Sequence, residues 1–116
     1  MTMTWNEVFE VHRKIAAVYF GGGKIKSMLF SQDKRRNRHH YKVGSTLYFC
    51  FDSSKNSSEI RLVKTVLEAG DVFRVFEKIA PDVYEDAGLH ICKSIGDGVD
   101  DLKRPSLVVT VEPYAS

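Results

Sequence analysis

The spacing of apolar residues predicts a helix at the start of the chain. Residues 4–20 repeat apolar side chains at intervals of three and four, which is typical of an amphipathic helix. Thr4 and Glu7 have the spacing of a capping box at its beginning. Glycines from Gly21 to Gly23 would end it, because glycine readily adopts the left-handed conformation found after helices. We therefore expect a helix that ends near Gly21.

Beyond the glycines, short apolar segments bounded by turn residues have the length and composition of strands. The expected strands are residues 24–31, 44–51, 59–67 and 106–112. Asp71 can cap a helical pattern that continues through Ile79, and Pro81 begins a shorter helical stretch through Ala87. Residues 89–101 alternate like a strand but also fit an extension of that helix.

This order of elements predicts a single α+β domain over residues 1–116, with a small curled sheet or β-barrel, an N-terminal helix and one or two further helices. An apolar content of 43% in 116 residues fits one modest core. The apolar runs are far too short to span a bilayer, and Cys50 and Cys92 are widely separated without a metal-binding or redox spacing. We expect a cytoplasmic protein with no membrane partner and no cofactor.

The small net charge of +2 hides an uneven distribution along the sequence. Residues 1–66 hold twelve Lys or Arg and five Asp or Glu, a balance of +7, whereas residues 67–116 hold five and ten, a balance of −5. One interpretation is a face suited to a polyanion. The other is that opposite charges complement each other across the fold.

Much of the positive charge lies in the basic segment, residues 33–42, with the sequence DKRRNRHHYK. It connects two expected strands, and such loops often carry functional residues. Its cations, Lys34, Arg35, Arg36, Arg38 and Lys42, can neutralise phosphates. Tyr41 and either His39 or His40 could stack on an unpaired base. RNA or another single-stranded nucleic acid is therefore the favoured partner; an acidic protein surface and a purely solvated loop are the alternatives.

Adjacent His39 and His40 also raise the question of a metal site. Neighbouring residues on a strand point to opposite faces, and no Cys or acidic residue lies at a ligand spacing from them. We expect no metal here.

The segment GGGKIKS contains the other candidate site residues. Strand alternation would place Lys24 and Lys26 on one face and Ser27 on the other, unless a bulge interrupts the strand. A lysine beside a tight glycine turn can be partly desolvated and act as a base. Two ordinary surface lysines explain the same spacing.

Several of these segments together resemble the ASCH domain of the PUA-like superfamily. The similar stretches are AAVYFGGGKIKSMLF, YKVGSTLYF, EIRLVKTVLEAGDVFRVFEKIAPD and SLVVTVEPY, which lie within residues 12–113. The chain departs from the family pattern at Met28 and Leu29, where an acid and an arginine are usual, and at Ser45, where Asp is usual. The strand that normally precedes the first helix is not evident in the sequence.

The resemblance implies a small β-barrel with a cleft for RNA or a modified nucleoside. Some compact members of the family are amidohydrolases that act on N4-acetylcytidine through a Lys, a Thr and a Glu. Lys24 matches that lysine, and Ser27 falls where the threonine would be. The acid would come from Asp82 or Glu85, of which we take Glu85 as the candidate. Three functions thus remain open: a nucleic-acid or modified-nucleotide binding domain, an amidohydrolase, and a small protein-binding module of a mobile element.

Overall fold

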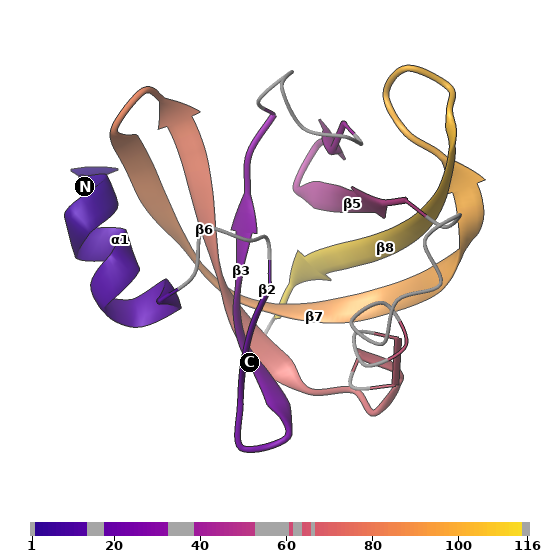
Figure 1. Ribbon diagram of the computed structural model, residues 1–116, viewed down its shortest axis with the longest axis horizontal. Helices are drawn as coiled ribbons and strands as arrows, with labels where there is room; N and C mark the ends of the chain where they lie inside the picture. Colours follow the sequence, from indigo (N-terminus) through magenta and orange to yellow (C-terminus); the bar gives the residue numbers. More distant parts are fainter. Residues whose placement is uncertain are drawn as a thin grey trace.

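The structure, a computed structural model, describes residues 2–13, 18–32, 39–52, 61, 64, 65 and 67–114. Strands dominate it (Figure 1). The elements in order are β1 (Thr2–Met3), α1 (Trp5–His12), β2 (Val18–Gly21), β3 (Lys24–Phe30), β4 (Tyr41–Val43), β5 (Thr46–Phe51), β6 (Val72–Ala80), β7 (Val83–Val99) and β8 (Pro105–Pro113). The expectation of a small α+β domain is confirmed, although the sheet is larger than the sequence predicted.

The eight strands form one sheet in the order β2-β3-β6-β7-β8-β5-β4, and β1 adds to β7. All neighbouring strands are antiparallel except β3 and β6, which are parallel. Figure 1 shows that β7 sweeps across the molecule and joins two parts of the sheet. One part contains β2, β3 and β6, and the other contains β8, β5 and β4.

The length of β7 explains why the sheet curls. Its 17 residues would span roughly 56 Å as a straight strand, but the longest axis of the molecule is only 35 Å. Register shifts mark where the ladder bends: one between Val75 and Phe76 opposite Gly88, and another between Cys92 and Ser94. Gly88 has a φ of 85°, a conformation that favours glycine at such a bulge.

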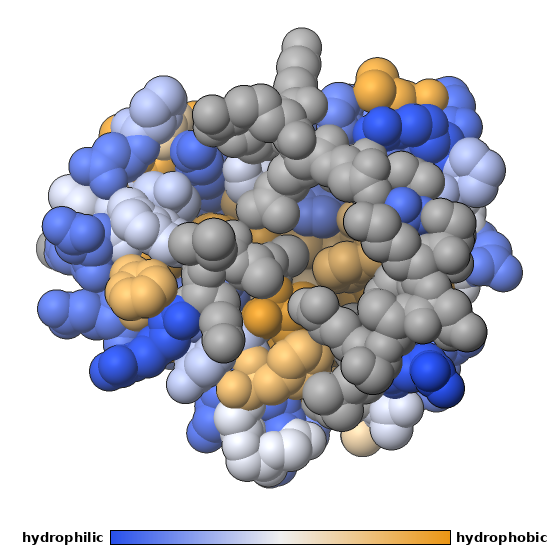
Figure 2. Space-filling model, in the orientation of Figure 1, coloured by the Kyte–Doolittle hydropathy of each residue, from blue (hydrophilic) through white to orange (hydrophobic). Residues whose placement is uncertain are grey.

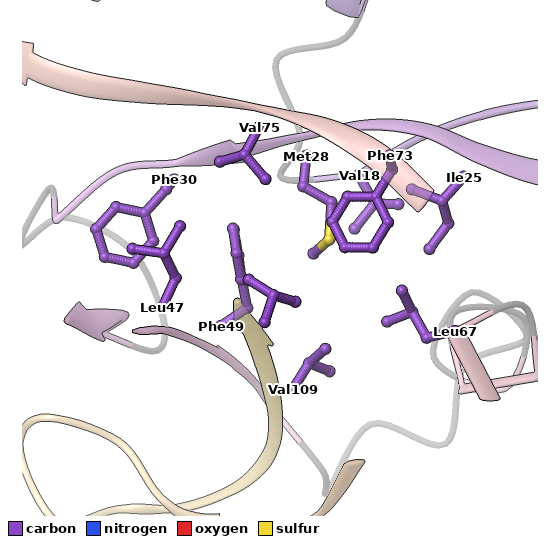
Figure 3. Close-up of a cluster of buried hydrophobic side chains, with 11 residues drawn as sticks. Val18, Ile25, Met28, Phe30, Leu47, Phe49, Leu67, Phe73, Val75 and Val109 are labelled. Carbon is purple, nitrogen blue, oxygen red and sulfur yellow. The ribbon is translucent and has the colours of Figure 1, made fainter. Parts of the chain in front are cut away.

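The main core fills the space between the two parts of the sheet. Side chains from β3 and β6, such as Met28 and Phe73, point toward Phe49 and Val109 on β5 and β8 (Figure 3). All four are at most 1% exposed. Apolar surface is visible near the middle of this view of the molecule, whereas the periphery is largely hydrophilic (Figure 2). The two parts of the sheet bury apolar side chains against each other, and this burial stabilises the curled sheet.

The helix α1 packs on the other side of β3, where Val8 forms a second apolar cluster with Leu29, Phe76 and Tyr84. The expected capping box is present: the Thr4 side chain accepts from the Glu7 backbone N–H, and the Glu7 side chain accepts from the Thr4 backbone N–H. The backbone N–H of Trp5 also donates to Asp82 Oδ1 at 2.8 Å, which ties the start of the helix to the turn after β6.

The helix is shorter than predicted. It ends at His12, because Arg13 adopts a left-handed conformation (φ 58°) and its N–H closes back on the Phe9 carbonyl. The segment Val18–Gly21 is strand β2 instead of the end of a helix. The short strand β1, which was not evident in the sequence, precedes the helix.

Three other predictions of secondary structure were wrong. The expected strand 59–67 is helical at its described residues, and the Thr65 hydroxyl donates to the Arg61 carbonyl as it does within a helical turn. The helix expected over 71–79 is strand β6, and the helical stretch expected after Pro81 lies in β7. The ambiguous residues 89–101 are strand through Val99. The other three predicted strands correspond to β3, β5 and β8.

Candidate nucleic-acid interface

The basic segment begins outside the described residues, which exclude 33–38 and therefore Lys34, Arg35, Arg36 and Arg38. Its end, from His39 to Lys42, is described. Each of these four residues is held in a different way, and together they fix where the segment joins the sheet.

His39 is anchored through its backbone to the loop between β7 and β8. Its N–H donates to Asp100 Oδ2 at 3.0 Å, and its carbonyl accepts from the Asp101 N–H at 3.2 Å. Asp100 is 1% exposed and also binds Arg104, whose Nε and Nη2 lie 3.0 and 2.7 Å from Oδ2. The backbone N–H groups of Leu102 and Arg104 both donate to Oδ1 at 2.9 Å. One buried carboxylate thus fastens the loop and the end of the basic segment together.

The environment of Asp100 keeps it charged. Burial by itself would raise the pKa of this carboxyl, but hydrogen bonds from the Arg104 side chain and from the backbone of Arg104, His39 and Leu102 outweigh burial and lower the pKa. The anchor is therefore ionised throughout the neutral range.

His40 belongs to the core. It is 3% exposed, its Nδ1 accepts from the Cys50 backbone N–H at 2.9 Å, and its ring lies among Phe30, Phe49 and Phe51. A ring in this position is not accessible to a base at the surface. Burial, followed by the charges of Asp100 and Asp101, raises the pKa of the neighbouring Cys50 to about 12, so this thiol stays protonated and is a poor nucleophile.

Tyr41 stacks on Tyr48. The two residues are directly paired across β4 and β5, and their ring centroids are 4.6 Å apart with an angle of 12° between the planes. Burial, with smaller electrostatic contributions from Cys50, Tyr48 and Asp101, raises the pKa of the Tyr41 hydroxyl. The hydroxyl is therefore protonated at neutral pH and available as a donor.

Lys42 is engaged in an ion pair. Its Nζ lies 3.0 Å from Glu77 Oε1 on β6, and the side chains are 40% and 15% exposed. A phosphate bound to Lys42 would therefore compete with Glu77 for the same ammonium group.

The glycine-rich turn is a β-hairpin between β2 and β3. Gly22 and Gly23 have φ of 60° and 74°, as required at both central residues of a type I′ turn. Tyr19 pairs with Ser27 and Phe20 with Ile25, so Lys26 is the extra residue of a bulge. The sequence analysis named a bulge as the one feature that would break the simple alternation of Lys24, Lys26 and Ser27, and the structure contains that bulge.

The two lysines of this hairpin are exposed. A Cβ added at Gly21 would lie 2.9 Å from Lys26 Cε, so the aliphatic part of Lys26 lies across the bare glycine backbone. Neither Lys24 nor Lys26 forms an ion pair with a described residue. Both can therefore bind an anionic ligand without breaking an ion pair to a described residue.

Ser27 is only 1% exposed, and its Oγ lies 2.7 Å from His12 Nδ1, which is itself buried at the end of α1. Glu85 is exposed on β7, opposite Thr2 of β1 and Glu77 of β6. Asp82, the other acid considered, caps α1. No hydrogen bond or ion pair in the described structure joins any two of Lys24, Ser27 and Glu85. The hydrolase interpretation stays a prediction.

Three features of this region were missed in the sequence. Tyr48 was taken only as a strand residue, although pairing with Tyr41 across a Gly44-Ser45 turn could have been anticipated from that turn. Asp100 stands near the end of residues 89–101, whose ambiguous pattern gave no sign of an anchoring role. His12 appeared as a polar residue within a helical repeat, and no local signal indicated its contact with Ser27.

Within the described part of the chain, no group of three His, Cys, Asp or Glu residues could hold a metal ion. No helix described there combines the length and apolar character needed to cross a membrane.

Comparisons with known proteins give one informative match. No family model and no curated protein matches the chain. Among solved structures, the modification-dependent restriction endonuclease TagI is similar in fold, with a TM-score of 0.67 and 11% sequence identity. The match covers 98% of this chain and 48% of that protein, so this chain spans about half its length. At this identity, the likeness concerns the fold alone.

Proposed function

We propose that this chain is a binding domain for RNA or for a modified nucleotide, built on a curled, open sheet of PUA-like type. The observation that carries the proposal is the anchored end of the basic segment: four cations in five residues are followed directly by His39, whose backbone is held by Asp100 and Asp101. A fixed end reduces the conformational entropy that a charged segment loses when it engages a polyanion. The cations would neutralise phosphates, and the sheet would supply the surface beside them.

The PUA-like assignment is supported by the curled sheet and its filled interior. The sheet bends back far enough for β4 to contact β6 through Lys42 and Glu77, although β4 ends the strand order. The similarity of the segments around β3, β5 and β8 to the ASCH pattern points the same way.

The structural neighbour supports a nucleic-acid ligand by analogy. Its name describes a restriction endonuclease whose action depends on modification, and its fold resembles nearly all of this chain. Because one fold can serve many functions, the analogy adds to the charge argument and does not replace it.

The hairpin lysines would provide a second contact, at the end of β3 opposite to the basic segment (Figure 1). Lys24 and Lys26 are exposed and unpaired among the described residues, so they can add phosphate contacts without breaking an ion pair. The burial of Ser27 beneath His12 favours this binding role over a catalytic one for the hairpin.

Binding of fluorescein-labelled single-stranded RNA, single-stranded DNA and duplex DNA, followed by anisotropy over a salt series, tests the proposal. We expect binding to single-stranded RNA with an affinity that falls as salt rises, since counterions are released when phosphates are neutralised. Absence of binding to all three at low salt, together with no binding of free modified nucleosides in calorimetry, would refute it.

A further inference from the structure

The stacked pair of Tyr41 and Tyr48 stands at an edge of the sheet. β4 is the last strand in the order, so Tyr41 has β5 on one side and no described strand on the other. One face of its ring is covered by Tyr48. No other described ring contacts Tyr41, and neither tyrosine hydroxyl donates to a described residue. Among the described residues, the stack therefore ends at Tyr41.

The short strand that carries Tyr41 is anchored on one side by a buried carboxylate and on the other by a partly exposed ion pair. His39 is fixed by Asp100 and Asp101 on one side, and Lys42 is fixed by Glu77 on the other. These contacts engage residues on both sides of Tyr41, whereas the side chain of Tyr41 itself has only the ring contact with Tyr48 within the described part of the chain. A ring held in this way loses little conformational freedom when a ligand stacks on it.

We propose that Tyr41, backed by Tyr48, is a stacking surface for one unpaired base of a single-stranded nucleic acid. The inference rests on the proposed function and names the part of the ligand that this surface takes. Aromatic side chains bind unpaired bases in this way because every base presents a π-face. A base within a duplex has both faces covered by its neighbours, so the surface would select single strands.

The charges around the ring favour a base over a phosphate at this position. Asp101 is close enough to interact electrostatically with Tyr41 and would repel a phosphate placed beside it. Lys42, the next residue, is paired with Glu77, and the nearest cation before Tyr41 is Arg38, three residues earlier in the sequence. Three residues of chain reach at most about 10 Å, so phosphate-neutralising charge is tethered near whatever stacks on the ring.

The test compares a short fluorescein-labelled single-stranded RNA with an oligomer of the same length and charge in which the central nucleotides are abasic. Wild-type protein should bind the RNA roughly 5- to 100-fold more tightly than the abasic oligomer. Tyr41→Leu should lose affinity for the RNA by a similar factor and should bind the abasic oligomer as the wild type does. Tyr41→Phe keeps the ring and should stay within about threefold of wild type. Tyr114→Leu, which removes an exposed tyrosine elsewhere, is the matched control and should change nothing.

The outcomes separate this inference from the proposed function. Equal wild-type affinity for the two oligomers, or a folded Tyr41→Leu variant with wild-type affinity for the RNA, would overturn the stacking surface and leave nucleic-acid binding intact. No wild-type binding to either oligomer at low salt would overturn the stacking surface, and it would overturn the proposed function as well if duplex DNA and free modified nucleosides also fail to bind. If circular dichroism shows that Tyr41→Leu does not fold, the affinities of wild-type protein for the RNA and for the abasic oligomer are compared instead. Equal affinities would overturn the stacking surface.

Discussion

Lys42 Nζ and Glu77 Oε1 lie 3.0 Å apart and join strands that are not neighbours in the sheet. β4 ends the strand order, whereas β6 is the third strand from the opposite end. A second contact lies beside it. The ring of Phe30, which pairs with Glu77 across β3 and β6, has its centroid 6.0 Å from that of His40, which directly precedes β4. The hydrogen-bonded ladder remains open there, and side chains bridge the gap.

Because Lys42 is 40% exposed, this bridge should contribute little to stability. A double-mutant cycle with Lys42→Met and Glu77→Gln should give a coupling energy of about 0.2–1 kcal/mol that shrinks at high salt. Urea unfolding of the four proteins at low and high salt measures it. A coupling well above that range and insensitive to salt would mean that the pair is effectively buried and part of the core.

The Asp100 anchor should matter more. Asp100→Asn replaces one oxygen by a donor that faces other donors and leaves Arg104 without its counter-charge. We expect the free energy of unfolding to fall by about 2–3 kcal/mol at neutral pH. The exposed neighbour Asp101 provides the matched control, since Asp101→Asn should stay within about 0.5 kcal/mol of wild type. Equal effects of the two variants would contradict the anchor role.

The contribution of Asp100 should depend on pH in a defined direction. The pKa of this carboxyl is lower in the folded protein than in the unfolded chain, so its stabilisation is present above the unfolded pKa of about 3.9 and is lost as the pH falls through the folded pKa. The difference between wild type and Asp100→Asn in urea unfolding should be constant from about pH 7 to 5 and shrink below about pH 4. A difference that instead grows on acidification would show that another group is responsible.

The contact between His12 and Ser27 should be structural. Ser27→Ala removes a buried hydrogen bond of 2.7 Å and should cost about 1–3 kcal/mol in unfolding free energy. Ser94→Ala, on an exposed strand position, should cost almost nothing. If Ser27→Ala is as stable as Ser94→Ala, the hydroxyl does not hold α1 to β3.

The same burial leads to a prediction about catalysis. Ser27 cannot meet a substrate while α1 covers it, so the wild-type protein should not hydrolyse N4-acetylcytidine. Chromatographic detection of cytidine and acetate after long incubation is the measurement, with heat-denatured protein as the blank. Hydrolysis by the wild type that is abolished in Lys24→Ala would establish the amidohydrolase instead.

The strands β3, β5 and β8 were predictable because each is short, apolar and bounded by turn residues. β6 was not, and its environment explains why. Phe73 and Val75 face the main core, whereas Phe76 faces the cluster under α1. A strand covered on both faces loses the alternation that identifies strands, and its apolar spacing then imitates a helix.

The opposite error occurred before β6, where apolar residues at alternating positions predicted a strand and the described residues are helical. Leu67 packs into the main core from that helical region, so tertiary contacts outweighed the β-propensity of the segment. For the candidate site, the sequence identified the basic segment and the hairpin lysines. It could not identify Asp100 or His12, because their partners lie 61 and 15 residues away in the chain.

The central claim is that the basic segment engages nucleic acid, and a salt series on one triple variant tests it most directly. Arg35, Arg36 and Arg38 are changed together to Ala, and a control changes Lys64, Lys78 and Lys93, which lie outside the segment, so that both proteins carry three fewer positive charges. With single-stranded RNA, the arginine variant should bind about 1–3 kcal/mol more weakly. The slope of log affinity against log salt should flatten by roughly 0.7 for each phosphate that the variant no longer neutralises. Equal affinities and slopes for wild type, arginine variant and control would contradict the claim.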